Sequence, residues 1–77
     1  MRQAVPPYKR IAAELRAKIE AGELRPGEQV PSANKLAEEH GVNRNTALRA
    51  LKLLAGEGLI TMEQGWGSFV SDPTAGS

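Results

Sequence analysis

The sequence predicts a mainly α-helical domain with a small β-hairpin, a winged helix-turn-helix built from three helices and a wing of about two or three strands. Three observations lead to this fold class. Apolar residues recur at helical spacing, a turn of about three residues containing Gly41 joins two predicted helices, and a Gly-rich hairpin follows them. We divide the chain into a flexible N-terminal arm over residues 1–7, the winged helix-turn-helix over residues 8–71 and a disordered tail or linker over residues 72–77.

The first helix is predicted from Tyr8, because apolar residues then fall on one helical face and charged residues fall off it. Those apolar residues are Tyr8, Ile11, Ala12, Leu15 and Ile19. Pro6 and Pro7 favour an extended approach to the helix, and Gly22 ends it. The following Pro26-Gly27 predicts a turn, and residues 29–30 are long enough for a very short strand.

The second and third helices are marked by their end signals. Ser32 is a good N-cap and Gly41 a good stop for a short second helix. Asn43 is the N-cap candidate of a longer third helix that runs from Arg44 to about residue 57. Two short strands are then expected within residues 59–71, joined by a turn over residues 64–67, with Met62 and Phe69 in the hairpin core.

Composition limits the possible functions. The 77 residues leave room for one domain with a thin core, and the absence of cysteine excludes a disulfide framework and a thiolate zinc site. No segment has the composition of a membrane span or a signal peptide, so we expect a soluble cytoplasmic protein with no membrane partner. We find no nucleophile with a base, no carboxylate pair and no phosphate-binding glycine loop, which predicts a protein that is not an enzyme and has no cofactor or metal.

Positive charge is concentrated on the third helix, although the formal net charge of the chain is only +1. At about 100° per residue, Ala47, Ala50, Leu51 and Leu54 share one arc that must face the core. The opposite arc holds Asn45, Leu48, Arg49 and Lys52, and Arg44 and Thr46 flank the N-terminal turn. A duplex major groove admits one helix, and Arg, Asn and Thr are suited to base edges and phosphates.

Charged residues on a helix often do no more than solvate it. Three features favour nucleic-acid binding here: residues 41–55 contain no acidic residue, the turn from the preceding helix is tight, and a Gly-rich hairpin follows. The hypothesis that follows is a helix presented to the major groove of double-stranded DNA.

The segment from Tyr8 to Val70 resembles the N-terminal DNA-binding domain of GntR-type bacterial transcription regulators. The resemblance rests on the spacing of Ile19, Gly22, Leu24, Pro26 and Gly27, on "PS" before the second helix and "LA" within it, on "GV-R-T", "AL--L" and "EGLI", and on the final "G-GSFV". It implies a winged-helix fold, operator binding, the third helix in the major groove and the wing tip in the minor groove.

The chain departs from the family pattern at three positions where the family commonly has arginine: Asn34, Leu48 and Trp66. Each lost phosphate contact should lower the salt slope of binding by about 0.9, so we expect modest affinity per domain. Arg44 and Thr46 transfer directly from the family pattern. The full set that we expect to contact DNA is Ser32, Asn34, Lys35, Asn43, Arg44, Asn45, Thr46, Leu48, Arg49, Lys52, Gly65, Trp66 and Gly67.

Two of these residues have alternative interpretations. Leu48 is suited to contact a thymine methyl group, and equally to pack under the wing or against another protein. Trp66 is suited to lie on the sugar-phosphate backbone or in the minor groove, and equally to fold over the hairpin as a cap.

The sequence thus predicts a DNA-binding domain of a bacterial transcription regulator associated with the nucleoid, most often a repressor in such families because an occupied operator excludes polymerase. The operator is expected to be palindromic. The isolated domain is expected to be monomeric and to pair on DNA or through a C-terminal domain beyond residue 77. The alternative is a winged-helix module for protein-protein interaction that has lost DNA binding, with Leu48, Leu53 and Trp66 as anchors.

Overall fold

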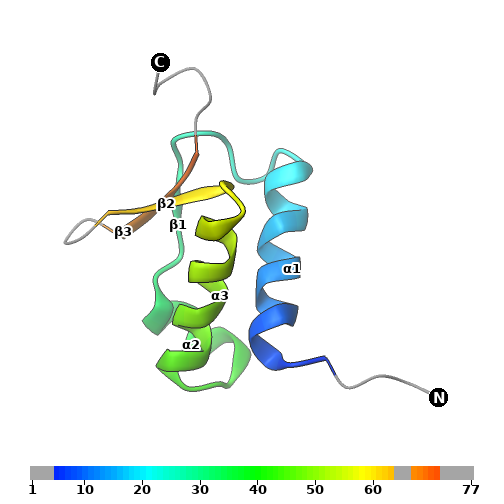
Figure 1. Cartoon of the computed structure of the whole chain (residues 1–77), viewed down its shortest axis with the longest axis vertical. Coiled ribbons are helices and arrows are strands. Elements are labelled where there is room, and N and C mark those ends of the chain that lie inside the picture. The colour runs from blue at the N-terminus through cyan, green and yellow to red at the C-terminus, as the bar shows by residue number, and fades with distance from the viewer. Residues whose placement is uncertain (1–4, 64–66, 72–77) are drawn as a thin grey trace.

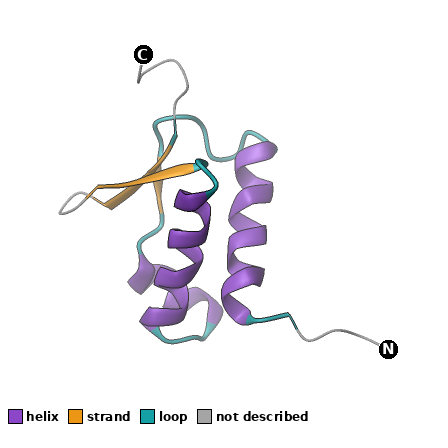
Figure 2. Ribbon diagram, viewed as in Figure 1, coloured by secondary structure: helices purple, strands orange, loops and turns teal. Residues whose placement is uncertain are grey.

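The computed structural model describes residues 5–63 and 67–71. Within these ranges the chain forms three helices and three strands in the predicted order (Figures 1 and 2). The elements are α1 (Pro7–Glu20), β1 (Gln29–Val30), α2 (Ala33–His40), α3 (Arg44–Gly56), β2 (Ile60–Glu63) and β3 (Gly67–Val70). The predicted tail and most of the predicted arm and hairpin turn, including Gly65 and Trp66, lie outside the described residues.

Helix α1 begins at Pro7, one residue earlier than the sequence predicted. Proline suits this position because the first N–H groups of a helix have no intrahelical partner and the ring already has a helical φ. At the other end Gly22 has φ +83°, and its N–H donates to the Ile19 carbonyl at 3.2 Å. The left-handed glycine therefore ends the helix as predicted.

Side-chain caps mark the starts of α2 and α3. Ser32 Oγ accepts a hydrogen bond from the Lys35 N–H at 3.2 Å, and Asn43 Oδ1 accepts one from the Thr46 N–H at 2.9 Å. Between the two helices Gly41 has φ +67°, a left-handed conformation that other residues adopt at a cost. Both predicted N-caps and the predicted stop are confirmed.

The three strands form an antiparallel sheet in the order β1-β3-β2. β3 lies in the middle, with Phe69 opposite Gln29 on one side and Thr61 on the other. Gly67, which the sequence assigned to the turn, is the first residue of β3 and pairs with Glu63.

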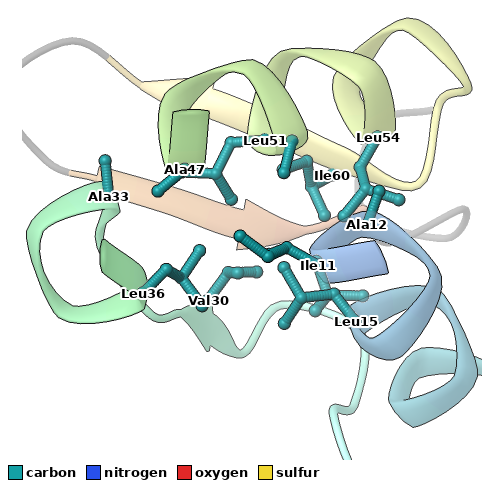
Figure 3. Packing of buried hydrophobic residues seen from close by; sticks show 12 residues of the cluster. Ile11, Ala12, Leu15, Val30, Ala33, Leu36, Ala47, Leu51, Leu54 and Ile60 are labelled. Carbon is teal, nitrogen blue, oxygen red and sulfur yellow. The ribbon is translucent and has the colours of Figure 1, made fainter. Parts of the chain in front are cut away.

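The core lies between the helices and one face of the sheet (Figure 3). The four α3 residues predicted to face inward are all buried, with at most 2% of their surface exposed. They pack with Ile11, Ala12, Leu15, Val30, Ala33, Leu36, Ile60 and Val70.

The prediction that Met62 lies in the hairpin core is wrong. Met62 is 37% exposed although it shares a sheet face with Ile60 and lies opposite the buried Ser68, because β2 is an edge strand and has a neighbouring strand on one side only. Phe69 is half-buried and lies outside the core cluster, on the opposite face of β3 from the buried Ser68 and Val70.

Helices α1 and α3 lie side by side and run in the same direction (Figure 1). Besides the shared core, two side-chain contacts join these helices, Tyr8 with Arg49 near the start of α1 and Arg16 with Glu57 at the end of α3. Both pairs join residues the same distance apart in the sequence, as expected for parallel neighbours. The N-terminal ends of both helices are therefore brought to the same end of the domain.

Candidate nucleic-acid interface

The outer face of α3 carries the polar residues that the sequence placed there. Arg44, Asn45, Arg49 and Lys52 are exposed, and Thr46 and Leu48 are half-buried. Residues 44–56 include no carboxylate. A helix N-terminus also attracts anions through its free N–H groups, so the residues of α3 themselves make a positive surface.

Two hollows flank this face. One, of 580 Å³, lies between the start of α1 and α3 and is lined by Pro6, Pro7, Tyr8, Asn43, Asn45, Thr46, Leu48, Arg49 and Lys52. The other, of 610 Å³, lies between α3 and the wing and is lined by Ser32, Ala33, Arg44, Leu48, Leu51, Lys52, Met62, Glu63, Gly67 and Ser68. We call them the α1-side hollow and the wing-side hollow. Leu48 and Lys52 line both, so they form the ridge between them.

Most of the predicted interface residues in the described part of the chain line one of these hollows. Asn34 and Lys35, on the first turn of α2, line neither. Lys35 Nζ instead lies 4.0 Å from Glu39 Oε2, and both side chains are at least half exposed. A pair of this kind is weak, so it leaves Lys35 free to exchange its partner for a phosphate.

Two of the predicted residues already use part of their hydrogen-bonding capacity. Asn43 Oδ1 caps α3, which leaves its amide N–H groups as the side-chain donors for a partner. Ser32 Oγ accepts from α2, which leaves its hydroxyl hydrogen. Both side chains therefore have a structural role whatever they bind.

The sequence did not indicate that Tyr8 belongs to this surface. The structure places its half-buried ring against the core cluster and in the α1-side hollow. The guanidinium carbon of Arg49 lies 4.8 Å from the ring centroid, within the range of a cation-π interaction. Apolar periodicity alone assigned Tyr8 to the helix face, and no local pattern reports a partner on another helix.

Leu48 takes an intermediate position. It is half-buried and packs against the core cluster, yet it also lines the wing-side hollow together with the exposed Met62. The two side chains give this hollow an apolar wall, and Arg44 lines the hollow one turn before Leu48 on α3.

No helix in the part of the chain that the structure describes has both the length and the apolar character of a membrane span. Residues 5–63 and 67–71 likewise contain no group of three or more His, Cys, Asp or Glu side chains placed to hold a metal ion.

The family model described as "Bacterial regulatory proteins, gntR family" matches residues 7–70. The chain belongs to the GntR family. Among the relatives of this GntR chain, the HTH-type transcriptional repressor NagR of Bacillus subtilis is 41% identical over 69 residues, and the histidine utilization repressor of Klebsiella aerogenes is 38% identical over 68 residues. The matches cover 90% and 88% of the GntR chain but only 28% of either relative.

Solved structures give the same assignment. The DNA-binding domain of AraR in complex with operator ORR3 superimposes on the GntR chain with a TM-score of 0.87 at 31% identity, covering 92% of this chain and 86% of that one. A GntR family transcriptional regulator from Listeria monocytogenes gives a TM-score of 0.86 at 26% identity, covering 96% of this chain and 65% of that one. The predicted winged helix-turn-helix and the predicted family are both confirmed.

Proposed function

We propose that this chain is the sequence-specific DNA-binding domain of a bacterial transcription repressor, with α3 as the helix that enters the major groove. The proposal is supported by the repressors among its relatives and by the AraR domain, whose structure was solved with an operator. It assigns the chain a binding function, without catalysis, cofactor or metal. Its place of action is the nucleoid in the bacterial cytoplasm.

The main support for this proposal is the outer face of α3. A major groove about 12 Å wide accepts a helix about 10–12 Å in diameter, and the strand backbones then run along both sides of the helix. The two hollows lie on those sides, and both contain cationic side chains. Arg44 is placed to donate to guanine or a phosphate, Asn45 to pair with adenine, and Thr46 to bind a phosphate near the helix N-terminus.

The wing and α2 supply the remaining contacts in the proposal. Ser32 and Gly67 line the wing-side hollow, where their backbones are suited to meet one strand. Asn34 and Lys35 are assigned to the flanking backbone from the first turn of α2. Gly65 and Trp66 are retained in the proposed interface on the family resemblance alone.

A repressor of this type acts on a palindromic operator. Two copies of the domain would occupy half-sites about 34 Å apart, one helical turn of DNA. The domain alone is proposed to be a monomer that pairs on DNA or through a C-terminal domain outside this sequence.

A mobility-shift titration tests the function. Duplexes selected from a random pool should bind the chain more tightly than unrelated duplexes, and affinity should fall steeply as salt rises from about 50 to 200 mM. Absence of duplex binding at low salt would overturn the proposal.

A protein-interaction module is the second candidate function. It is favoured by one observation, the apolar wall that Leu48 and Met62 form in the wing-side hollow. An apolar partner interface would be nearly insensitive to salt, which distinguishes it from duplex binding in the same titration.

A further inference from the structure

The side chain of Arg49 on α3 lies over an aromatic ring of the neighbouring helix α1. Its guanidinium carbon lies 4.8 Å from the centroid of Tyr8, and the side chain itself is exposed. At about 100° per residue, Asn45 lies almost opposite the buried arc, and Lys52 and Arg49 lie about 30° to either side of that direction. The contact with Tyr8 shows that Arg49 is on the side that adjoins α1.

Tyr8 is a fixed support for this arginine. Its ring is half-buried against the core cluster, and its backbone lies in the first turn of α1. That turn is held by the Lys9 N–H, which donates to the Pro6 carbonyl at 3.0 Å. The support is therefore set by the fold and is present before any partner binds.

A guanidinium held over a ring keeps its donors available. Stacking uses the face of the group, and the five N–H donors lie in its plane, where they fit two oxygens of a phosphate. Arginine ordered in this way also loses less side-chain entropy on binding than a freely rotating arginine.

The surroundings of Arg49 favour an anion. Lys52 lines the same α1-side hollow, and among the described residues no carboxylate lines it. The wing-side hollow contains Glu63, and a third hollow beside α1 contains Glu14. Of these three, only the α1-side hollow combines cations with no acidic residue.

We propose that Tyr8 is a positioning residue that holds Arg49 for a backbone phosphate of the bound duplex, in the α1-side hollow. The inference rests on the proposed function and deepens it. Arg49 contributes affinity rather than sequence preference, and Tyr8 acts through Arg49.

Arg49→Ala tests the first part by its effect on two duplexes of equal length, one selected for binding and one unrelated. We expect affinity for both to fall by a similar factor, about tenfold, and the slope of log affinity against log salt to become shallower by about 0.9. Lys18→Ala is the matched control, because it removes one exposed cation from the last turn of α1, away from α3's outer face. A loss confined to the selected duplex, or an equal change of slope in the control, would overturn the phosphate assignment.

Tyr8→Leu and Tyr8→Phe test the second part. Tyr8→Leu removes the aromatic face and should weaken binding by about two- to fivefold, the range of an exposed cation-π interaction, whereas Tyr8→Phe should bind like the parent. In the Tyr8→Leu/Arg49→Ala double variant, the affinity should equal that of Arg49→Ala alone.

Equal losses in Tyr8→Phe and Tyr8→Leu would mean that the hydroxyl itself contacts DNA, and additive losses in the double variant would mean that Tyr8 does not act through Arg49. Either result would overturn the positioning role. Thermal melts identify any variant whose loss comes from unfolding, and the Tyr8→Phe comparison remains interpretable if Tyr8→Leu melts early. If the parent chain binds the selected duplex and the cycle is additive, this inference fails while the proposed function stands.

Discussion

Arg16 on α1 holds the carboxylate of Glu57, just beyond the end of α3, through hydrogen bonds from Nε and Nη2 at 2.7–3.0 Å. About two turns nearer the N-termini, Arg49 in the middle of α3 lies over the ring of Tyr8 in the first turn of α1. Two side-chain contacts thus join α1 and α3 beside the hollow between them. The main face of the proposed interface is built on packed helices.

We expect Arg16→Met to lower the free energy of unfolding by up to about 1 kcal/mol, because the pair is bidentate but about one-third exposed. Methionine retains an apolar stem, so the loss comes from the charge. Chemical denaturation with urea at 0.05 and 1 M NaCl measures it, and the difference from the parent should shrink at the higher salt. Glu39→Gln, which breaks the longer Lys35 pair, should change stability little. An undiminished loss at 1 M NaCl would contradict an electrostatic role.

Asn43→Ala should destabilise the domain by about 1 kcal/mol, because it leaves the Thr46 N–H without its 2.9 Å acceptor. For a domain of this size the melting temperature should drop by about 4–8 °C, measured by circular dichroism. Asn43→Ser is the control, since serine is an equally good N-cap and should melt close to the parent. If both variants melt like the parent, the cap does not stabilise α3.

Arg44→Ala should weaken binding to a selected duplex by about 1–3 kcal/mol if the arginine pairs with a base edge. Arg44 is exposed, so the variant should melt like the parent. Fluorescence anisotropy titration beside a thermal melt measures both properties.

Leu51→Ala should lose stability, whereas Arg44→Ala should lose only duplex affinity. Comparing the two variants therefore checks that effects on folding and on binding can be told apart. Leu51 is 2% exposed in the core, and its truncation should cost about 2–5 kcal/mol of stability. Unchanged duplex affinity in Arg44→Ala would exclude the proposed contact.

The two interpretations of Leu48 are separable by removing a single methyl group from the DNA. If Leu48 contacts a thymine methyl, replacing that thymine by deoxyuridine in a selected duplex should cost the parent about 0.8 kcal/mol, the value of one buried methylene. The same replacement should cost a Leu48→Ala variant nothing. Isothermal titration with each duplex, one thymine at a time, provides the measurement. Equal sensitivity of both proteins at every thymine would assign Leu48 to packing.

The sequence was sufficient to predict the order of the helices and strands and the residues of α3 that face the core. Ser32, Gly41 and Asn43 are local signals whose physics acts within a few residues, and all three act as predicted. The apolar arc of α3 is equally local, since helical geometry alone places Ala47 and Leu54 on one side.

The features that the sequence did not indicate depend on how distant segments meet. Nothing near Met62 reports that its strand lies at the edge of the sheet, so its apolar side chain was assigned to the interior. Nothing near Tyr8 reports Arg49, and nothing near Arg16 reports Glu57, because each partner lies on a different helix. The exposed residues of the proposed site could therefore be predicted as one face of a helix. The side chains that orient them could be identified only from the packed structure.

Backbone amide chemical shifts, followed as a selected duplex is added to the isotopically labelled chain, test the central claim most directly. We predict the largest changes over residues 43–52 and at Tyr8, with little change at Ile19 and Leu24 near the far end of α1. Changes centred on Ile19 and Leu24, with residues 43–52 unaffected, would contradict the assignment of α3 to the DNA.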